Sequence, residues 1–202
     1  MLEDLSKKQK ITLICLLIVI SGMIGWVYEY FCYYMNSGFK QFYMRGANFL
    51  PWINIYAYGA FLIIAMTYRK RENPLQVFLL SMLVTGILEY FSGYILYGKL
   101  GWTKCWDYNQ EILNFGNIGG YVCLRSVLVF GLSGLALMYL ILPVLSKLVR
   151  SKYINIIFII SIIICSIFIL DEIYNLVIAH IFHLPRARDI YKTFGLKYLY
   201  FK

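Results

Sequence analysis

Five long apolar stretches make up most of this chain, and they limit its fold more than any other feature. A helix needs about 20 mostly apolar residues to cross the roughly 30 Å hydrocarbon core of a bilayer. Five segments are long and apolar enough: 11–35, 50–68, 75–97, 118–145 and 153–183. We therefore predict an all-α, polytopic transmembrane helix bundle of about five helices, with a re-entrant or sixth element at the C-terminal end left open.

Composition supports a membrane location for the whole chain. Hydrophobic residues are 61% of the 202 residues and charged residues 14%, whereas soluble domains carry about 25% charge. This chain is too short for a second, soluble catalytic domain beside the bundle. We expect a single membrane-embedded domain over 1–202. The apolar run 11–24 is too long for a cleavable signal.

Basic residues indicate the orientation, because short cytoplasmic loops carry an excess of Lys and Arg. The N-terminal arm and two short turns hold nine of them: Lys7, Lys8, Lys10, Arg69, Lys70, Arg71, Lys147, Arg150 and Lys152. The loops on the other side hold four: Lys40, Arg45, Lys99 and Lys104. We predict a cell-membrane protein with a cytoplasmic N-terminus. Orientation explains the net charge of +9, so no nucleic-acid partner is expected.

The C-terminal tail conflicts with this orientation. Five spans place it outside, yet it carries Arg186, Arg188, Lys192, Lys197 and Lys202. Two arrangements would resolve the conflict: a tail that folds back, or a separate re-entrant or sixth element after Asp171.

Charged side chains inside the predicted spans point to function, since each costs roughly 2.5 to 3.5 kcal/mol to insert. They are Glu29, Glu89, Arg125, Asp171 and Glu172. A rise of about 1.5 Å per residue places all five in or near the outer half of the membrane. It places Arg125 about seven residues below the outer end of its helix. Arg45 is expected in an outer loop, from which its side chain could reach toward them.

These charges allow two interpretations. In the first, Arg125 pairs with one or two carboxylates and only locks the bundle. In the second, the excess of acid lines a polar cavity that opens outward. No motif for a metal, cofactor or P-loop is present, so none is expected. A disulfide from Cys105 to Cys32 or Cys123 stays open.

The order of several short motifs resembles a known bacterial family. Its parts are Gly25-Trp26-x-x-Glu29, Arg45-Gly46, Ile55-Tyr56-x-x-Gly59, Leu88-Glu89-Tyr90, Trp106-Asp107-Tyr108 and Asn117-x-x-Gly120-Tyr121-x-Cys123-Leu124. The series resembles the Putative ABC-transporter type IV family, also called CmpB-like, over residues 21–145. The segment 153–202, a C-terminal helix with a basic tail, lies outside the resemblance.

The resemblance implies a permease-like multi-pass protein and points to Glu29, Arg45, Glu89 and the Trp106-Asp107-Tyr108 loop. It also implies a separate ATPase subunit that docks on the inner loops, around 69–73 and 147–152. The chain departs from the family pattern at Asn54, Leu50 and Tyr121, where Pro, Gly and Arg are expected.

We therefore predict a permease-like protein that binds a small polar or cationic solute in an outward-facing acidic cavity. One alternative is a membrane-embedded enzyme acting on a lipid or lipid-linked substrate at the outer leaflet. A second is a structural or regulatory subunit. Membrane lipids are expected partners, and association into a homo-oligomer is left open. The predicted substrate-binding residues are Glu29, Arg45, Glu89, Trp106, Asp107, Tyr108, Arg125 and Asp171.

Overall fold

The computed structural model describes residues 2–102 and 104–198, and this part of the chain is helical, with no strand. The first helix, α1 (Lys7–Asn36), begins at a capping box. The Ser6 hydroxyl accepts the backbone N–H of Gln9, and the Gln9 side chain accepts that of Ser6. This pairing satisfies backbone donors that have no partner within the helix. With 30 residues, α1 is about 45 Å long.

The other helices follow in chain order. Three of these helices continue through a wide π-helical turn: α3 continues into 94–99, α4 through 137–141 into α5, and α6 through 174–178 into α7. The basic residue Lys202 of the predicted tail lies outside the described part of the chain. The bounds are α2 (Asn54–Thr67), α3 (Pro74–Gly93), α4 (Leu124–Ala136), α5 (Leu142–Val149), α6 (Ile154–Ile173), α7 (Ala179–Ile181) and α8 (Ala187–Thr193).

A helical membrane bundle is confirmed. Four continuous helices are long and apolar enough to cross a membrane: 7–36, 74–99, 124–149 and 154–181. The remaining predicted span is shorter than the sequence indicated, because α2 has only 14 residues. A helix of that length rises about 21 Å, less than the hydrocarbon core of a bilayer.

Asp171 explains why α2 begins late. Its carboxylate accepts the backbone N–H groups of Phe49 and Leu50 at 2.9 and 3.2 Å and the indole N–H of Trp52 at 3.0 Å. Pro51 also disfavours helical geometry at the residue before it. The segment that leads into α2 is therefore held in a non-helical conformation against α6.

The fourth predicted span also begins later than expected. Gly119 and Gly120 have φ of +63° and +80°, a region that side chains with a Cβ rarely adopt. Cys123 then caps α4, which begins at Leu124. The predicted depth of Arg125 was therefore wrong: it is the second residue of its helix and not the eighth.

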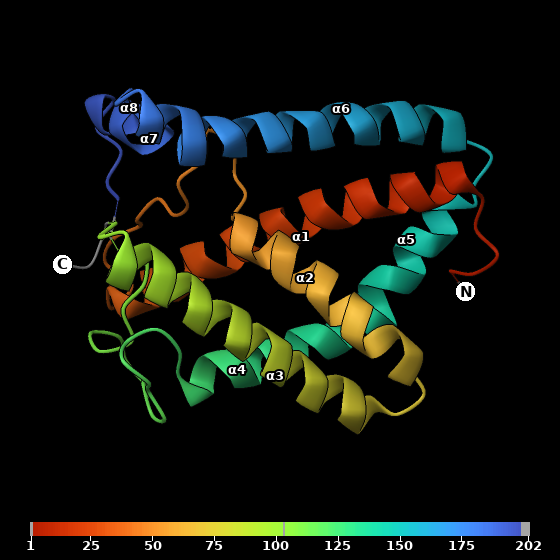
Figure 1. Cartoon of the computed structure of the whole chain (residues 1–202), viewed down its shortest axis with the longest axis horizontal. Helices are drawn as coiled ribbons and strands as arrows, with labels where there is room; N and C mark the ends of the chain where they lie inside the picture. The colour runs from red at the N-terminus through yellow and green to blue at the C-terminus, as the bar shows by residue number, and fades with distance from the viewer. Residues whose placement is uncertain (1, 103, 199–202) are drawn as a thin grey trace.

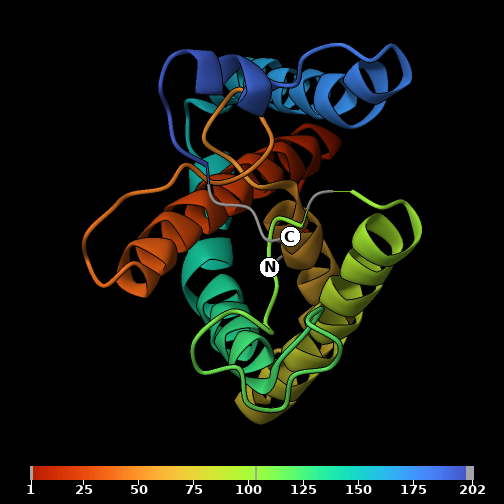
Figure 2. The ribbon, with the colours of Figure 1, turned by 90° about the vertical axis from the view of Figure 1, so that its left-hand side faces the viewer.

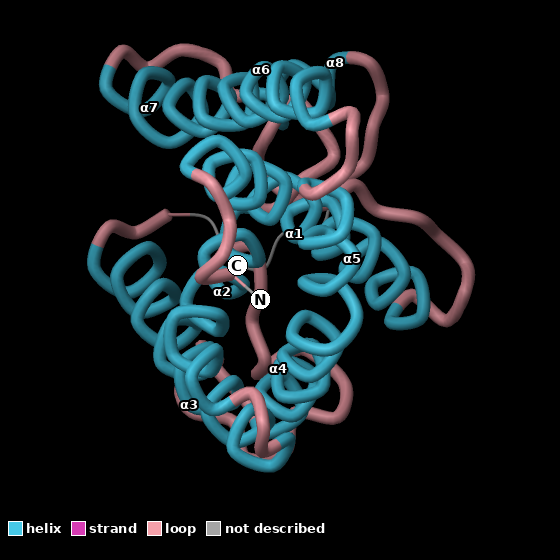
Figure 3. The backbone as a smooth tube through the Cα atoms, turned by 90° about the vertical axis from the view of Figure 1, so that its right-hand side faces the viewer, coloured by secondary structure: helices cyan, strands magenta, loops and turns pink. Residues whose placement is uncertain are grey.

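The helices form layers, as Figure 1 shows. α6 packs on α1, α1 packs on α2, and α3 packs on both α2 and α4. We call one end of the bundle the long-loop end; it carries the segments 37–53, 100–123 and 182–198. Figure 2 looks at this end, and Figure 3 at the opposite one, the short-loop end.

Small residues let α3 and α4 approach closely. A Cβ atom on Gly134 would lie 2.0 Å from the Ser81 hydroxyl, and one on Gly131 would lie 2.6 Å from the Phe78 ring. Helices in membranes associate largely through such close packing. The two helices are thus closely packed on the side of the bundle that carries the site described below.

The basic N-terminal arm and the two basic turns lie at one end of the bundle, as the sequence predicted. The basic tail lies at the other end. The N-terminal arm and the turns 69–73 and 150–153 lie at the short-loop end (Figure 1). The described part of the tail stays at the long-loop end and does not fold back. The Met44 amide donates to the Lys197 carbonyl at 2.8 Å, and Tyr191 donates to the Phe49 carbonyl at 2.7 Å.

The contacts of Asp171 generate a stability prediction. Asp171→Ala should lower the free energy of unfolding by about 3 kcal/mol, because four donors, on Phe49, Leu50, Trp52 and Asn175, lose a charged acceptor. Thermal unfolding of the purified protein in detergent measures the change. Glu172→Ala is the matched control, since its neighbouring carboxylate bonds one hydroxyl, on Tyr58. Equal losses for the two variants would contradict the anchoring role of Asp171.

Candidate functional site

A cavity of about 380 Å³ lies at the long-loop end of the bundle. Its wall comes from α1, α2, α3 and α4 and from the loop 100–123. Most of the sequence-predicted polar residues meet here. The polar and aromatic side chains that line it are Tyr28, Glu29, Cys32, Tyr33, Asn36, Tyr56, Glu89, Trp106, Tyr108, Glu111, Arg125 and Phe130.

Glu29 and Arg45 form a buried ion pair at this wall. The Arg45 Nε donates to Glu29 at 2.8 Å, and Arg45 is only 5% exposed. Its guanidinium also stacks 3.7 Å from the centre of the Tyr33 ring and donates to the Cys105 carbonyl at 2.6 Å. Burial lowers the pKa of Arg45, but the Glu29 carboxylate raises it more, so the pKa lies above its usual value. Arg45 therefore stays charged behind Glu29.

A second ion pair joins the loop to α4. Arg125 donates to Glu111 at 2.7 Å and to the Ile112 carbonyl at 2.7 Å. The Tyr33 hydroxyl donates to the other Glu111 oxygen at 2.6 Å. Sequence reasoning missed Glu111, because a depth argument applies only to residues inside predicted spans. Tyr33, which bonds Glu111, is buried as well.

Glu89 on α3 has a different environment. The Tyr108 hydroxyl donates to one of its carboxylate oxygens at 2.6 Å. The Ser126 hydroxyl lies 2.7 Å from the other oxygen and has the Cys123 carbonyl, at 2.8 Å, as an alternative acceptor. Both donors are neutral hydroxyl groups. Glu89 is buried, so its carboxylate has little contact with water.

The charges of the cavity wall do not cancel. Glu29 pairs with Arg45, and Glu111 pairs with Arg125. Among residues 2–102 and 104–198, no Lys, Arg or His forms an ion pair with Glu89. A buried carboxylate without a cation is costly unless it is protonated or binds a positive group. Glu89 is therefore the group in this wall that can accept a cation.

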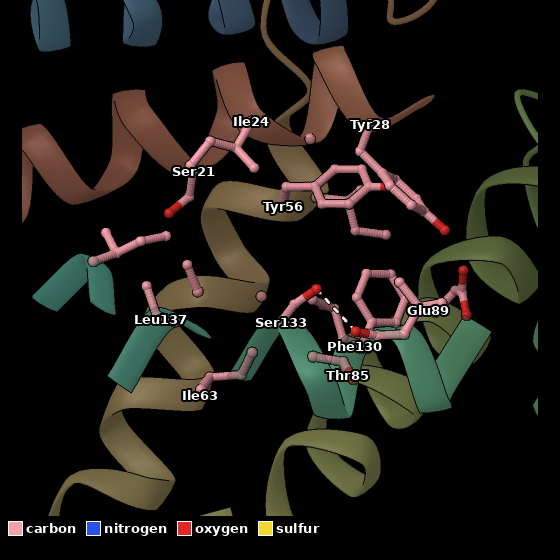
Figure 4. Close-up of a pocket in the computed structure, with 17 residues that line it drawn as sticks. Ser21, Ile24, Tyr28, Tyr56, Ile63, Thr85, Glu89, Phe130, Ser133 and Leu137 are labelled. Carbon is pink, nitrogen blue, oxygen red and sulfur yellow. Dashed lines mark hydrogen bonds between the residues drawn. The ribbon is translucent and has the colours of Figure 1, made fainter. Parts of the chain in front are cut away.

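A smaller cavity of about 150 Å³ adjoins the first and extends toward the middle of the bundle. Figure 4 shows its wall, where Tyr28, Tyr56 and Phe130 bring their rings together between the helices. Glu89 lines both cavities, as do these three rings. The rest of the smaller cavity is mostly apolar. Glu89 thus lies at the junction of the two spaces.

Tyr56 occupies its place because Gly25 has no side chain. A Cβ atom on Gly25 would lie 2.1 Å from the Tyr56 ring. The Tyr56 hydroxyl donates to Glu29 at 3.3 Å. Both residues belong to the motifs that carry the family resemblance, and their contact explains the need for glycine at that position of α1.

The Trp106-Asp107-Tyr108 loop covers the larger cavity, but its three side chains have different roles. Trp106 and Tyr108 line the cavity. Asp107 does not; it accepts hydrogen bonds from Lys104, Asn109 and Gln110 within the loop. Burial raises the pKa of Asp107, but the hydrogen bonds from Lys104, the Asn109 amide and Gln110 outweigh this, so the pKa is lowered. Asp107 holds the loop in shape.

Two other expectations from the sequence concern Asp171 and the cysteines. Asp171 bonds the segment 49–52, as described above, and is not among the lining residues. Cys32, Cys105 and Cys123 are free thiols, so the disulfide left open by the sequence is not formed. Within the described residues, no three His, Cys, Asp or Glu side chains gather as a metal site requires.

A comparison with protein families identifies the family of this chain. The family model described as Putative ABC-transporter type IV matches residues 16–176. The match extends beyond the stretch 21–145 that carries the motifs, and it includes Asp171 and Glu172. No curated protein and no solved structure matches the chain.

The Glu29–Arg45 pair generates a prediction of non-additive stability. Glu29→Gln alone should cost about 3 kcal/mol, because it leaves the Arg45 guanidinium buried without its carboxylate. The double variant Glu29→Gln, Arg45→Gln should cost less than the sum of the two single variants by about 1 to 3 kcal/mol. Chemical or thermal unfolding in detergent measures all four proteins. Glu72→Gln, at the exposed turn of the short-loop end, is the control, and strictly additive losses would rule out the pair as a buried unit.

Proposed function

We propose that this chain, which belongs to the Putative ABC-transporter type IV family, is a permease-like protein that binds a small cationic solute. The solute occupies the cavity at the long-loop end, with its positive group against Glu89. The family and the apolar helices establish a membrane protein. The solute, its site and its path are the proposal.

The observation that carries this proposal is the uncompensated Glu89 carboxylate. Its donors, Tyr108 and Ser126, are neutral. A cation could take the place of the Ser126 hydroxyl beside Glu89. That hydroxyl would still have a hydrogen-bond acceptor, the Cys123 carbonyl at 2.8 Å. The attraction between unit charges is also stronger in such a buried setting than in water.

The aromatic rings around Glu89 suit the same class of solute. Tyr28, Tyr56, Trp106, Tyr108 and Phe130 line the larger cavity. Faces of aromatic rings attract cations, most strongly where water is excluded, by about 2 kcal/mol in favourable cases. A space of about 380 Å³ accommodates an amine or quaternary ammonium ion of a few carbon atoms. Ring faces with one buried carboxylate therefore favour a small organic cation over a neutral solute.

The smaller cavity supports transport rather than binding alone. It continues from Glu89 toward the middle of the bundle, and the rings of Tyr28, Tyr56 and Phe130 line both spaces. Movement of these rings would pass the solute inward. Glu89, at the junction, would contact the cation on both sides of the rings.

The short-loop end supplies a surface for a partner. The basic turns 69–73 and 147–152 both lie at this end, and the Tyr139 hydroxyl, from the segment 137–141 before α5, donates to the Arg71 carbonyl of the first turn at 2.7 Å. We place this end in the cytoplasm of the cell, where a separate ATPase subunit would dock and supply energy. The long-loop end with the cavity then faces outward.

A binding measurement tests the proposal. Purified protein should bind choline or ethanolamine, and the uncharged choline analogue 3,3-dimethylbutan-1-ol should not compete. Glu89→Gln should raise the dissociation constant at least about tenfold, or about 1.4 kcal/mol, because Glu89 is the one lining carboxylate without a basic partner among the described residues. Equilibrium binding of the radiolabelled cation measures both values.

The control variant is Glu172→Gln, which removes a carboxylate that does not line either of these two cavities. It should bind the cations as the unaltered protein does. Two results would contradict the proposal: competition by the neutral analogue at equal strength, or unchanged binding by a folded Glu89→Gln protein. The structural alternative predicts this second result together with a loss of stability.

Orientation has its own test, by labelling intact cells with a membrane-impermeant maleimide. The native cysteines are first replaced, and one cysteine is then introduced at either end of the bundle. Lys99→Cys at the long-loop end should react before the cells are opened, and Glu72→Cys at the short-loop end should react only afterwards. The reverse order would place the cavity on the cytoplasmic side.

A further inference from the structure

We infer that the solute bound at Glu89 is an amphiphilic cation, an ammonium ion that carries an apolar group of about six carbon atoms, and that the smaller cavity holds this group. The inference rests on the proposed function and names the substrate class of the same site. The smaller cavity has the position, the lining and the size that such a group needs.

The smaller cavity begins at Glu89, which lies at its junction with the larger one. The Ser126 hydroxyl donates to the Glu89 carboxylate at 2.7 Å. Leu137, which lines the smaller cavity, follows Ser126 by about three turns of the same continuous helix, 124–149. The cavity thus extends from the carboxylate toward the short-loop end, and a solute held by Glu89 can reach into it.

The lining of the smaller cavity is apolar apart from Glu89 and a few hydroxyl groups. Thr85 donates to the Ser81 carbonyl at 2.6 Å, and Ser133 donates to the Val129 carbonyl at 2.9 Å, a bond drawn in Figure 4. A buried water needs about two to four polar partners, and these hydroxyl groups already donate within their own helices. The space therefore suits a hydrocarbon group better than water. Aliphatic residues of the wall include Ile24, Ala60, Ile63, Leu88, Val129 and Leu137.

The size of the smaller cavity sets the size of the apolar group. Its volume is about 150 Å³, and an apolar cavity of about 150 Å³ in a protein holds a molecule as large as benzene. Ile63 and Leu137 continue beyond it into a hydrophobic core with Val77 and Leu142, which are fully buried. This core closes the space toward the short-loop end and limits the apolar group to about six carbon atoms.

Gly59 on α2 keeps this space open. A Cβ atom on Gly59 would lie 3.8 Å from the Thr85 side chain and 3.9 Å from that of Leu88. These are ordinary van der Waals distances, so packing does not require glycine here as it does at Gly25. Glycine is less favourable than alanine inside a helix. Because Thr85 and Leu88 also line the smaller cavity, a side chain at position 59 would project into the space that the ligand needs.

Charge complementarity favours a cation over the other apolar occupant that a membrane supplies, a lipid acyl chain. The apolar space opens at one end on Glu89, which is buried. An uncharged chain would leave this buried carboxylate uncompensated, which is costly. One molecule that carries both an ammonium group and an apolar group fills both cavities and compensates the charge.

Equilibrium binding to the purified, full-length protein tests this inference. Benzyltrimethylammonium should bind at least about tenfold more tightly than choline, because its phenyl group leaves water for an apolar cavity. Its uncharged carbon analogue, neopentylbenzene, should not compete with it. In a series of butyl-, hexyl- and decyltrimethylammonium, the affinity should rise to the hexyl cation and gain nothing beyond it.

A cavity-filling variant locates the apolar group. Gly59→Leu should abolish the preference for benzyltrimethylammonium over choline. Ala65→Leu is the matched control, because it adds the same side chain at an exposed position of α2 outside the lining residues, and it should keep the preference. The alkyl series needs no substitution, so it decides the inference even if Gly59→Leu fails to fold.

The outcomes separate this inference from the proposed function. Equal affinities for benzyltrimethylammonium and choline, both dependent on Glu89, would overturn the apolar group and leave the proposed function intact. A rise that continues to the decyl cation, or an unchanged preference in folded Gly59→Leu, would overturn the smaller cavity as its place. Equal competition by neopentylbenzene, or choline binding that does not depend on Glu89, would overturn the proposed function itself.

Discussion

Compensation of charge inside an apolar bundle is the constraint on which this structure depends. The Glu29–Arg45 pair meets that constraint and also connects the parts of the long-loop end. Arg45 reaches from the segment 37–53 to α1, stacks on Tyr33 and donates to the Cys105 carbonyl of the next loop. A lone charge at this depth would cost several kcal/mol. The pair therefore fixes two loops to α1.

The charges around the cavity are compensated unevenly. The ion pairs of Glu29 and Glu111 are complete, and Glu89 is left with neutral donors among aromatic rings. This arrangement suits a cation at Glu89 and not at the other two carboxylates.

Part of this arrangement could be predicted from the sequence. Apolar length and helical rise identified the bundle and placed Glu29 and Glu89 in the same part of it, because depth in a straight helix follows directly from residue number. The family resemblance added Arg45, Trp106 and Tyr108, which depth alone could not assign to a site. The depth argument needs only a straight helix, and the resemblance needs only short motifs, so neither requires knowledge of contacts between distant segments.

Contacts between segments could not be predicted in this way. Asp171 looked like a site residue by depth, yet its carboxylate caps the segment 49–52, whose position depends on tertiary packing. Arg125 was placed too deep because glycines with positive φ delay the start of α4. Glu111 lies in a loop, where sequence position says nothing about burial. Each case depends on where an irregular segment lies, and apolar periodicity carries no information about that.

An experimental map of the protein with a bound organic cation tests the central claim most directly. Crystals or particles prepared with a brominated choline analogue would locate the cation through its anomalous signal or its added density. The account predicts a peak against the Glu89 carboxylate, enclosed by Tyr28, Tyr56 and Phe130. A peak elsewhere, or a cavity filled by a phosphate or an acyl chain while the cation is present at saturating concentration, would contradict it.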